Sequence, residues 1–212
     1  MSVLPSTVPL RAQAPAPDHV RVQRRLALAL GLWGGIAFLL AASGVTKRLP
    51  TRLLPVPILL GITGPLLVYA RSRAFRDYIH ALDMRGMLTL FNVWRIPAAL
   101  AFFIYGARGK LPAIFVRNAA WGDMIAGILA PAVAIWSARR ASDHPEAFMG
   151  FHLFSITDFM VAVGTGFVFS LRNDRRMSML KVLPMALIPL FGVPVTGAFS
   201  LMALHRLLTR HR

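Results

Sequence analysis

The chain lacks cysteine altogether and has few charged residues. With no cysteine among its 212 residues, disulfides, iron–sulfur clusters, thiolate metal sites and cysteine nucleophiles are all excluded. Only 15% of the residues are charged, and Asp and Glu together contribute 8. Typical soluble proteins carry about 25% charged residues. The chain therefore has too little polar surface for a water-soluble globular domain.

The motifs of familiar soluble enzymes are also missing. The sequence contains no Gly-rich phosphate loop, no zinc-protease helix motif, no serine nucleophile elbow and no dinucleotide-binding fingerprint. No internal repeat with a period of about 20 to 50 residues is present. We therefore assign no catalytic residue and no metal site, and the sequence leaves any cofactor unidentified.

What the chain does contain is apolar sequence and basic charge. Hydrophobic residues make up 56% of it, and the formal net charge is +16. The Lys and Arg residues lie in short clusters between apolar stretches, without the basic face or the motif of a nucleic-acid-binding module. Basic clusters beside apolar spans suit anionic lipid headgroups. We predict an integral membrane protein with membrane lipids as partners and no nucleic acid.

Six stretches approach the roughly 20 apolar residues that a helix needs to cross a bilayer core of about 30 Å. We therefore predict an all-α, polytopic transmembrane bundle over residues 26–207. The fourth span is ambiguous, because it can begin at Leu111 or, after a partly buried loop, at Asn118. The predicted spans are residues 26–45, 53–70, 87–107, 111–138, 147–171 and 182–204.

We predict a tail at each end of the transmembrane bundle. Residues 1–25 are rich in proline and end in the basic cluster Arg21, Arg24 and Arg25, which predicts a disordered basic tail. The apolar run that follows is longer than the about 7 to 15 residues of a signal peptide core, so we expect a retained first helix. Residues 208–212 are predicted to be a basic C-terminal tail.

A short amphipathic segment separates the second and third spans. Between residues 74 and 85, Phe75, Tyr78, Ile79 and Leu82 recur at helical spacing among charged residues. This pattern fits a short helix lying in the membrane interface. An ordinary polar loop is the alternative, because isolated helices of this length are marginal.

The distribution of Lys and Arg predicts the orientation. With six spans, the loops on the side of the two termini hold 13 basic residues and the opposite loops hold 9, leaving out Arg95 and Arg117. Cytoplasmic loops carry the excess of positive charge. We therefore expect a multi-pass protein of the cell inner membrane with both termini in the cytoplasm.

Three spans carry ionisable residues that are expensive at that depth. Asp158 lies near the middle of the fifth span, and Arg95 lies near the middle of the third with Asn92 one turn away. Antiparallel packing places Arg95 and Asp158 at similar depth, so we predict that they pair. Asp123 in the fourth span is a third member if that helix begins early. The cluster is either a structural ion pair or a substrate-binding and proton-relay site, whose candidates are Arg95, Asp158, Asp123 and Asn92.

Two further patterns leave alternatives open. His152 in the fifth span and His205 in the sixth could hold a haem or another cofactor from two helices, or could be hydrogen-bonded histidines of an interface. The sixth span contains prolines at 184, 189 and 194 with Gly192 and Gly197. Such interruptions line the substrate path in transporters, or only bend the helix for packing.

One set of residues carries a family resemblance. The segments Asn92-Val93-Trp94-Arg95, Leu111-Pro112 and Trp121-Gly122-Asp123 resemble a pattern of small uncharacterised bacterial inner-membrane proteins. The resemblance covers about residues 85–170. It implies a membrane location and no known activity.

The sequence supports three functional hypotheses. The first is a transporter or permease-like protein for a small polar or anionic solute, in which Arg95 attracts the solute and Asp158 or Asp123 relays a proton. The second is a membrane enzyme or a haem- or quinone-type redox subunit that uses His152 and His205. The third is an accessory subunit without chemistry. For the first, six helices predict assembly as a homodimer or with a partner membrane subunit.

Overall fold

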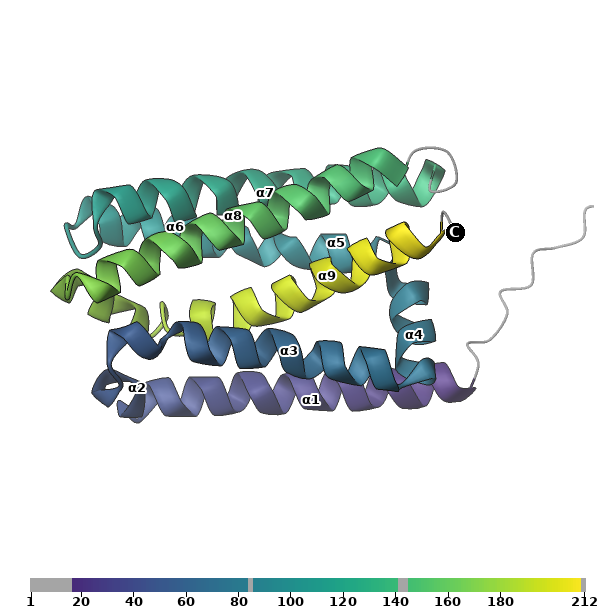
Figure 1. Cartoon of the computed structure of the whole chain (residues 1–212), viewed down its shortest axis with the longest axis horizontal. Coiled ribbons are helices and arrows are strands. Elements are labelled where there is room, and N and C mark those ends of the chain that lie inside the picture. The colour runs from purple at the N-terminus through teal and green to yellow at the C-terminus, as the bar shows by residue number, and fades with distance from the viewer. Residues whose placement is uncertain (1–16, 84–85, 141–144, 211–212) are drawn as a thin grey trace, which may run out of the picture.

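The computed structural model describes residues 17–83, 86–140 and 145–210. The protein is an all-α helical bundle, and the described residues form no strand. In Figure 1, α7 and α8 lie on one side of the bundle, α1 and α3 on the other, and α9 crosses obliquely between them. The elements are α1 (Pro17–Ala42), α2 (Val45–Arg48), η1 (Thr51–Leu53), α3 (Pro55–Arg71), α4 (Arg73–Asp83), α5 (Met87–Leu90), η2 (Phe91–Trp94), α6 (Arg95–Ala107), α7 (Ala113–Arg140), α8 (Pro145–Leu171), η3 (Arg175–Lys181), η4 (Ile188–Gly192) and α9 (Val193–Arg210).

Among the described residues, six helical segments are long and apolar enough to cross a membrane, which confirms the predicted number of spans. The chain is accordingly a multi-pass membrane protein. The start of α1 and the end of α9 lie at the same end of the bundle (Figure 1). The candidate spans are His19–Ala42, Thr51–Arg71, Met87–Ala107, Ala113–Trp136, Glu146–Leu171 and Ile188–Thr209.

Three predicted boundaries differ from the structure. The first helix begins at Pro17, so residues 17–25, which we expected in the tail, are helical; residues 1–16 lie outside the described residues. The last helix continues to Arg210, through most of the expected C-terminal tail. The sixth span begins at 188 rather than 182, since residues 175–181 form a short 3-10 helix and residues 183–186 form turns.

The amphipathic segment forms the helix α4, as one of our two interpretations predicted. It runs across the long axis of the bundle at the end where α1 begins (Figure 1). Side chains cap both helices where α3 meets α4. At the start of α4, Ser72 Oγ accepts from the Phe75 backbone N–H at 3.2 Å. At the end of α3, Arg76 donates to the carbonyls of Tyr69 and Ala70 at 3.0 and 2.9 Å. These bonds satisfy backbone groups that helix ends leave free.

Prolines interrupt the sixth span, and other helices satisfy the freed groups. Pro194 has no N–H to donate to the Leu190 carbonyl one turn earlier. Trp33 of α1 donates its indole N–H to that carbonyl at 3.0 Å instead. The chain takes a π-helical turn over Ile188–Gly192, and Gly192 lets the Trp94 ring pack directly on the backbone. Side chains from α1 and the third span therefore stabilise the irregular backbone of this span.

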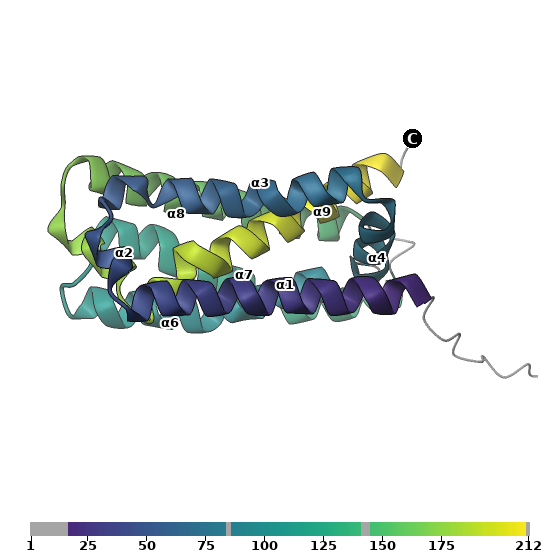
Figure 2. The same ribbon diagram turned by 90° about the horizontal axis from the view of Figure 1, so that it is seen from below.

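The sixth span lies at the centre of the bundle, and α1 lies at its edge. Of the apolar window in the sixth span, 72% is buried, against 11% for α1. Seen from below, α9 is visible between α1 and α3 (Figure 2). The outer faces of α1 and α3 carry exposed Leu, Ile and Val side chains, which suits contact with lipid.

Candidate functional site

Arg95 stands at the centre of the bundle, where the third span changes from a 3-10 turn to the helix α6. Pro97 lies two residues later and removes the N–H that would bond to the Val93 carbonyl, which explains the irregular backbone here. The side chain of Arg95 is fully buried. A buried guanidinium needs partners for its charge and for its five N–H groups.

Those partners come from the two neighbouring helices. Arg95 Nε donates to Asp123 Oδ1 of α7 at 2.7 Å, and Nη2 donates to Asp158 Oδ2 of α8. Nη1 donates to Ser155 Oγ of α8 at 2.8 Å. The Phe159 ring covers one face of the guanidinium, with 4.1 Å between Arg95 Cζ and the ring centroid. Arg95 thus joins α6, α7 and α8 through one planar group.

Asn92 supports this arrangement from one turn before Arg95. Its Oδ1 accepts from Ser155 Oγ at 3.2 Å and lies 3.5 Å from Arg95 Nη1. Its Nδ2 faces the carbonyls of Leu88 and Thr89 at 3.4 and 3.2 Å. Asn92 is fully buried. Its bond to Ser155 orients the Ser155 hydroxyl group towards the cluster. We call Arg95, Asp123, Asp158, Asn92 and Ser155 the Arg95 cluster.

A glycine makes room for the Asp158 carboxylate. A Cβ atom added at Gly122 of α7 would overlap the Asp158 carboxylate. At Gly127, one and a half turns later, an added Cβ would lie 2.6 Å from Ile96 Cγ1 of α6. Small residues let membrane helices approach closely. These two glycines therefore set how near α7 comes to α6 and α8, and with it the geometry of the Arg95 cluster.

The charges of the cluster do not cancel if all three groups are ionised. One guanidinium faces two carboxylates, so the formal charge is −1. Carboxylates that share one cation in a buried site favour a bound proton on one of them. Asp123 and Asp158 are 4% and 8% exposed, so bulk water solvates the charge of neither carboxylate.

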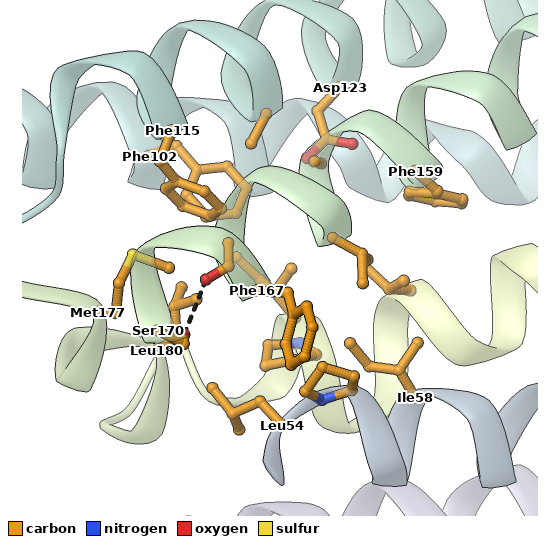
Figure 3. A pocket seen from close by; sticks show the side chains of 18 residues that line it. Leu54, Ile58, Phe102, Phe115, Asp123, Phe159, Phe167, Ser170, Met177 and Leu180 are labelled. Carbon is orange, nitrogen blue, oxygen red and sulfur yellow. Dashed lines mark hydrogen bonds between the residues drawn. The ribbon is translucent and has the colours of Figure 1, made fainter. Parts of the chain in front are cut away.

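A cavity lies beside Asp123. Its volume is about 60 Å³, and Asp123 and Ser170 are the polar residues on a wall that is otherwise apolar. Phe159 belongs both to this wall and to the surroundings of Arg95. Figure 3 shows Asp123 on the side of the cavity formed by α7, together with the labelled side chains Leu54, Ile58, Phe102, Phe115, Phe159, Phe167, Met177 and Leu180.

Residues 77–208 match the family model described as Domain of unknown function (DUF8737), which is more than half of the chain. The chain belongs to the DUF8737 family. No curated protein and no solved structure matches it. The DUF8737 region begins inside α4 and ends inside α9, so it contains the whole Arg95 cluster and leaves out α1 and α3.

The four residues that we predicted as a site, Arg95, Asp158, Asp123 and Asn92, meet in one cluster of the DUF8737 region. The fourth helix begins at Ala113, so the longer of its two predicted forms is correct and Asp123 lies well inside the span. Whether the cluster binds a substrate or relays a proton stays a prediction.

The two predicted cofactor ligands, His152 and His205, have separate neighbours. His152 Nε2 lies 3.3 Å from Thr89 Oγ1, and its ring packs against Phe148 and Phe151. His205 Nδ1 lies 3.1 Å from the hydroxyl of Tyr69. Within the described residues, no hydrogen bond or ring contact joins His152 to His205. Their role as cofactor ligands stays a prediction, without support from shared contacts.

The predicted site left out several contributors. Ser155 stands three residues before Asp158, on the same face of α8, and this spacing was the available signal for its bond to Arg95. Nothing in the sequence pointed to Phe159 as the ring that covers the guanidinium. His80 of α4 was also missed: its Nε2 lies 2.7 Å from the Tyr69 hydroxyl, so one tyrosine lies between His80 and His205.

Proposed function

We propose that this protein is a permease-like transport protein of the cell inner membrane that couples the binding of a small anionic or polar solute to the uptake of a proton. The observation that carries the proposal is the position of Asp123. Its carboxylate accepts a hydrogen bond from Arg95 and also forms part of the cavity wall. A solute in the cavity therefore meets Asp123 before it meets the guanidinium.

Protonation of Asp123 is the coupling step. As a carboxylate, Asp123 competes with an anionic solute for Arg95 Nε. When Asp123 takes up a proton, the excess negative charge of the cluster disappears and Arg95 Nε becomes free to donate to the solute. Asp158, Ser155 and the Phe159 ring hold Arg95 in place in both states. The proton stays on the Asp123 carboxyl group until the solute leaves.

The cavity limits the class of solute. Its volume of about 60 Å³ accommodates a few water molecules or a solute of similar size, since one water needs about 10–15 Å³ by this measure. The phenyl rings of Phe102, Phe115 and Phe159 suit an apolar end. A short-chain carboxylate satisfies both conditions, with its carboxylate at Arg95 and its apolar end against the rings.

The proposal extends to assembly and orientation. Six spans are few for an alternating-access transporter, so we propose that two copies, or one copy with a partner membrane subunit, form the working unit. The start of α1, the end of α9 and α4 lie at one end of the bundle. The predicted loops on this side hold more Lys and Arg, and we propose that this end faces the cytoplasm.

Uptake by the reconstituted protein tests the proposal. Proteoliposomes with a neutral interior take up radiolabelled pyruvate, used as a probe, faster from an acidic medium than from a neutral one. Asp123→Asn removes this dependence on external pH, because the amide cannot take up the coupled proton. Asp77→Asn is the matched control, since Asp77 is an exposed acid of α4 outside the cluster. The proposal fails if Asp123→Asn accumulates the probe under a pH gradient as the unaltered protein does.

The second candidate is an accessory membrane subunit without chemistry, and the complete pairing of Arg95 favours it. In that case the cluster only joins α6, α7 and α8. Asp123→Asn and Asp158→Asn then lower the abundance and thermal stability of the protein in parallel with any loss of function. Under the transport proposal, Asp123→Asn loses coupling while its abundance in the membrane stays close to that of the unaltered protein.

A further inference from the structure

A second, larger cavity lies far from the Arg95 cluster, at the edge of the bundle. It is a groove of about 320 Å³ between α1 and α3, and α9 forms its floor. Its walls are apolar except at the end near α4. The residues around it are Val22, Arg25, Leu26, Ala29, Leu30, Trp33, Pro65, Val68, Ser72, Phe75, Val195, Ala198 and Phe199.

Two contacts of α1 flank the groove. Near its start, the His19 ring meets the Tyr78 ring of α4, with 5.8 Å between centroids. Further along, Trp33 donates to the Leu190 carbonyl and packs against the Phe191 ring. These anchors are 14 residues apart, which is roughly 21 Å of helix. Between them α1 faces the groove.

The polar end of the groove lies at the depth of lipid headgroups. Arg25 is six residues, or about 9 Å, from the start of the first span at His19, and about 25 Å from its end at Ala42. The amphipathic helix α4 lies across the bundle axis at this end (Figure 1) and contributes Phe75 to the groove wall. Trp33, roughly 12 Å further along α1, marks the apolar interior of the groove. The groove is thus polar at the membrane surface and apolar towards the membrane centre.

Two hydrogen-bond donors stand at this polar end. Arg25 is exposed, and within the described residues its guanidinium forms no ion pair. Ser72 Oγ accepts from the Phe75 N–H, which leaves its own hydroxyl hydrogen available to donate. By contrast, Arg76 is held by the carbonyls that end α3, and Arg73 faces Asp77. Arg25 is therefore the cation that the groove offers to an anionic ligand.

We propose that this groove binds an anionic phospholipid, with an acyl chain between α1 and α3 and the phosphate at Arg25 and Ser72. A cation at the headgroup level, followed by an apolar channel that opens to the bilayer, matches the two chemical halves of such a lipid. The site is independent of the proposed transport. Because α1 and α3 lie outside the DUF8737 region, the lipid would join these two helices to the α9 surface of that region.

Quenching of Trp33 fluorescence measures the binding. The protein in detergent micelles is titrated with phosphatidylglycerol or phosphatidylcholine that carries brominated acyl chains, which quench tryptophan on contact. We expect half-maximal quenching at a several-fold lower fraction of phosphatidylglycerol than of phosphatidylcholine. The same titration on Trp33→Phe identifies the signal of this site, because the chain has four tryptophans.

Two variants and one control decide the outcome. Arg25→Gln loses most of the preference for phosphatidylglycerol, and Ala29→Phe, which fills the groove from α1 without adding a tryptophan, weakens the quenching of Trp33 by both lipids. Arg52→Gln changes an exposed cation at the opposite end of the bundle and leaves the preference as it was. The proposal is overturned if the two lipids quench Trp33 equally, or if Arg25→Gln keeps the preference of the unaltered protein.

Discussion

At the scale of single residues, the two aspartates around Arg95 are in different positions. Asp158 lies against the backbone of Gly122 and binds Nη2, so its carboxylate is enclosed by α7. Asp123 binds Nε and borders a cavity. A buried ion pair is costly to break, by about 3–5 kcal/mol, because the remaining charge has no partner. We therefore expect Asp158 to hold Arg95 in place, and under the proposed transport function Asp123 is the group that takes up the proton.

Gly122 tests the holding role of Asp158. Gly122→Ala places a methyl group where the carboxylate lies, so we expect the ion pair to Arg95 to be lost and stability to fall by about 3 kcal/mol or more. In an Asp158→Ala background the same change should cost much less, since the overlap is gone. Thermal unfolding in detergent of the four variants in this cycle gives both values.

A control with the same chemistry lies on α8. Gly164 has nothing within 4 Å of an added Cβ atom, so Gly164→Ala should leave the unfolding temperature nearly unchanged. If Gly122→Ala is as mild as Gly164→Ala, the enclosure of Asp158 by α7 does not fix the cluster.

At the scale of elements, side chains from other helices repair the backbone of the irregular spans. Trp33 of α1 bonds to the Leu190 carbonyl, and Trp94 of the third span donates to Thr196 of α9 at 2.7 Å. Thr196 in turn bonds to the Gly192 carbonyl at 2.9 Å. In a bilayer, no water is present to satisfy such groups. The irregular turn before α9 is thus stable because α1 and η2 hold it.

The bond from Trp33 can be tested with the proline that makes it necessary. Trp33→Phe should destabilise the protein by about 1 kcal/mol through the unsatisfied Leu190 carbonyl, beyond the loss of packing. Pro194→Ala restores an N–H that can reach this carbonyl within the helix. Trp33→Phe should therefore cost less when Pro194→Ala is present, as measured by thermal unfolding. Equal costs in both backgrounds would show that the carbonyl does not depend on the indole.

The histidine of α4 predicts a dependence of stability on pH. Burial, with the nearby cation Arg206, lowers the pKa of His80 below its ordinary value of 6.5, while Asp77 opposes this shift. His205 and Arg76 add smaller effects in the lowering direction. A lowered pKa means that the unfolded chain binds the proton more readily. The contribution of His80 to the free energy of unfolding is therefore fully present above about pH 6.5, and it is lost as the pH drops below that value.

Unfolding temperatures of the full-length protein between pH 8 and pH 5 check this prediction. His80→Gln, which keeps a hydrogen-bonding group near Tyr69, should flatten the profile below about pH 6.5. His19→Gln should retain the slope, because His19 meets Tyr78 at a different point of α4. A profile that is unchanged by His80→Gln would exclude His80 as its origin.

At the scale of the whole molecule, the bundle has a more basic end and a less basic end. By sequence, the segments that we expect on the side of α4 hold 13 of the basic residues outside Arg95 and Arg117, and the segments expected on the opposite side hold 9. The proposed lipid site lies at the former end. The orientation of the molecule therefore decides which leaflet supplies the lipid.

The absence of cysteine makes this orientation directly measurable. Single cysteines at Arg73 on α4 and at Arg108 between α6 and α7 stand at opposite ends of the bundle. In spheroplasts, an impermeant maleimide should label Arg108→Cys at once and Arg73→Cys only after the membrane is permeabilised. The reverse pattern of labelling would place both termini outside the cytoplasm.

Features that depend on short stretches of the chain can be predicted from the sequence alone. Apolar length predicts the six spans, helical spacing predicts α4, and the cost of charge in a membrane singles out Arg95, Asp123 and Asp158. These signals are local, so they can be read without knowing which helices meet. They failed at the start of the sixth span, where the apolar residues 182–186 form a bend and turns and not a spanning helix.

The contacts that those residues make depend on how the helices pack. The rotation of each helix about its axis determines that Arg95 meets both aspartates, that Ser155 and Phe159 join them, and that His205 faces Tyr69 and not His152. The space left by Gly122, the cavity beside Asp123 and the groove beneath α1 likewise depend on where helices distant in sequence approach each other. Hydropathy fixes how deep a residue lies in the membrane, but packing fixes its neighbours.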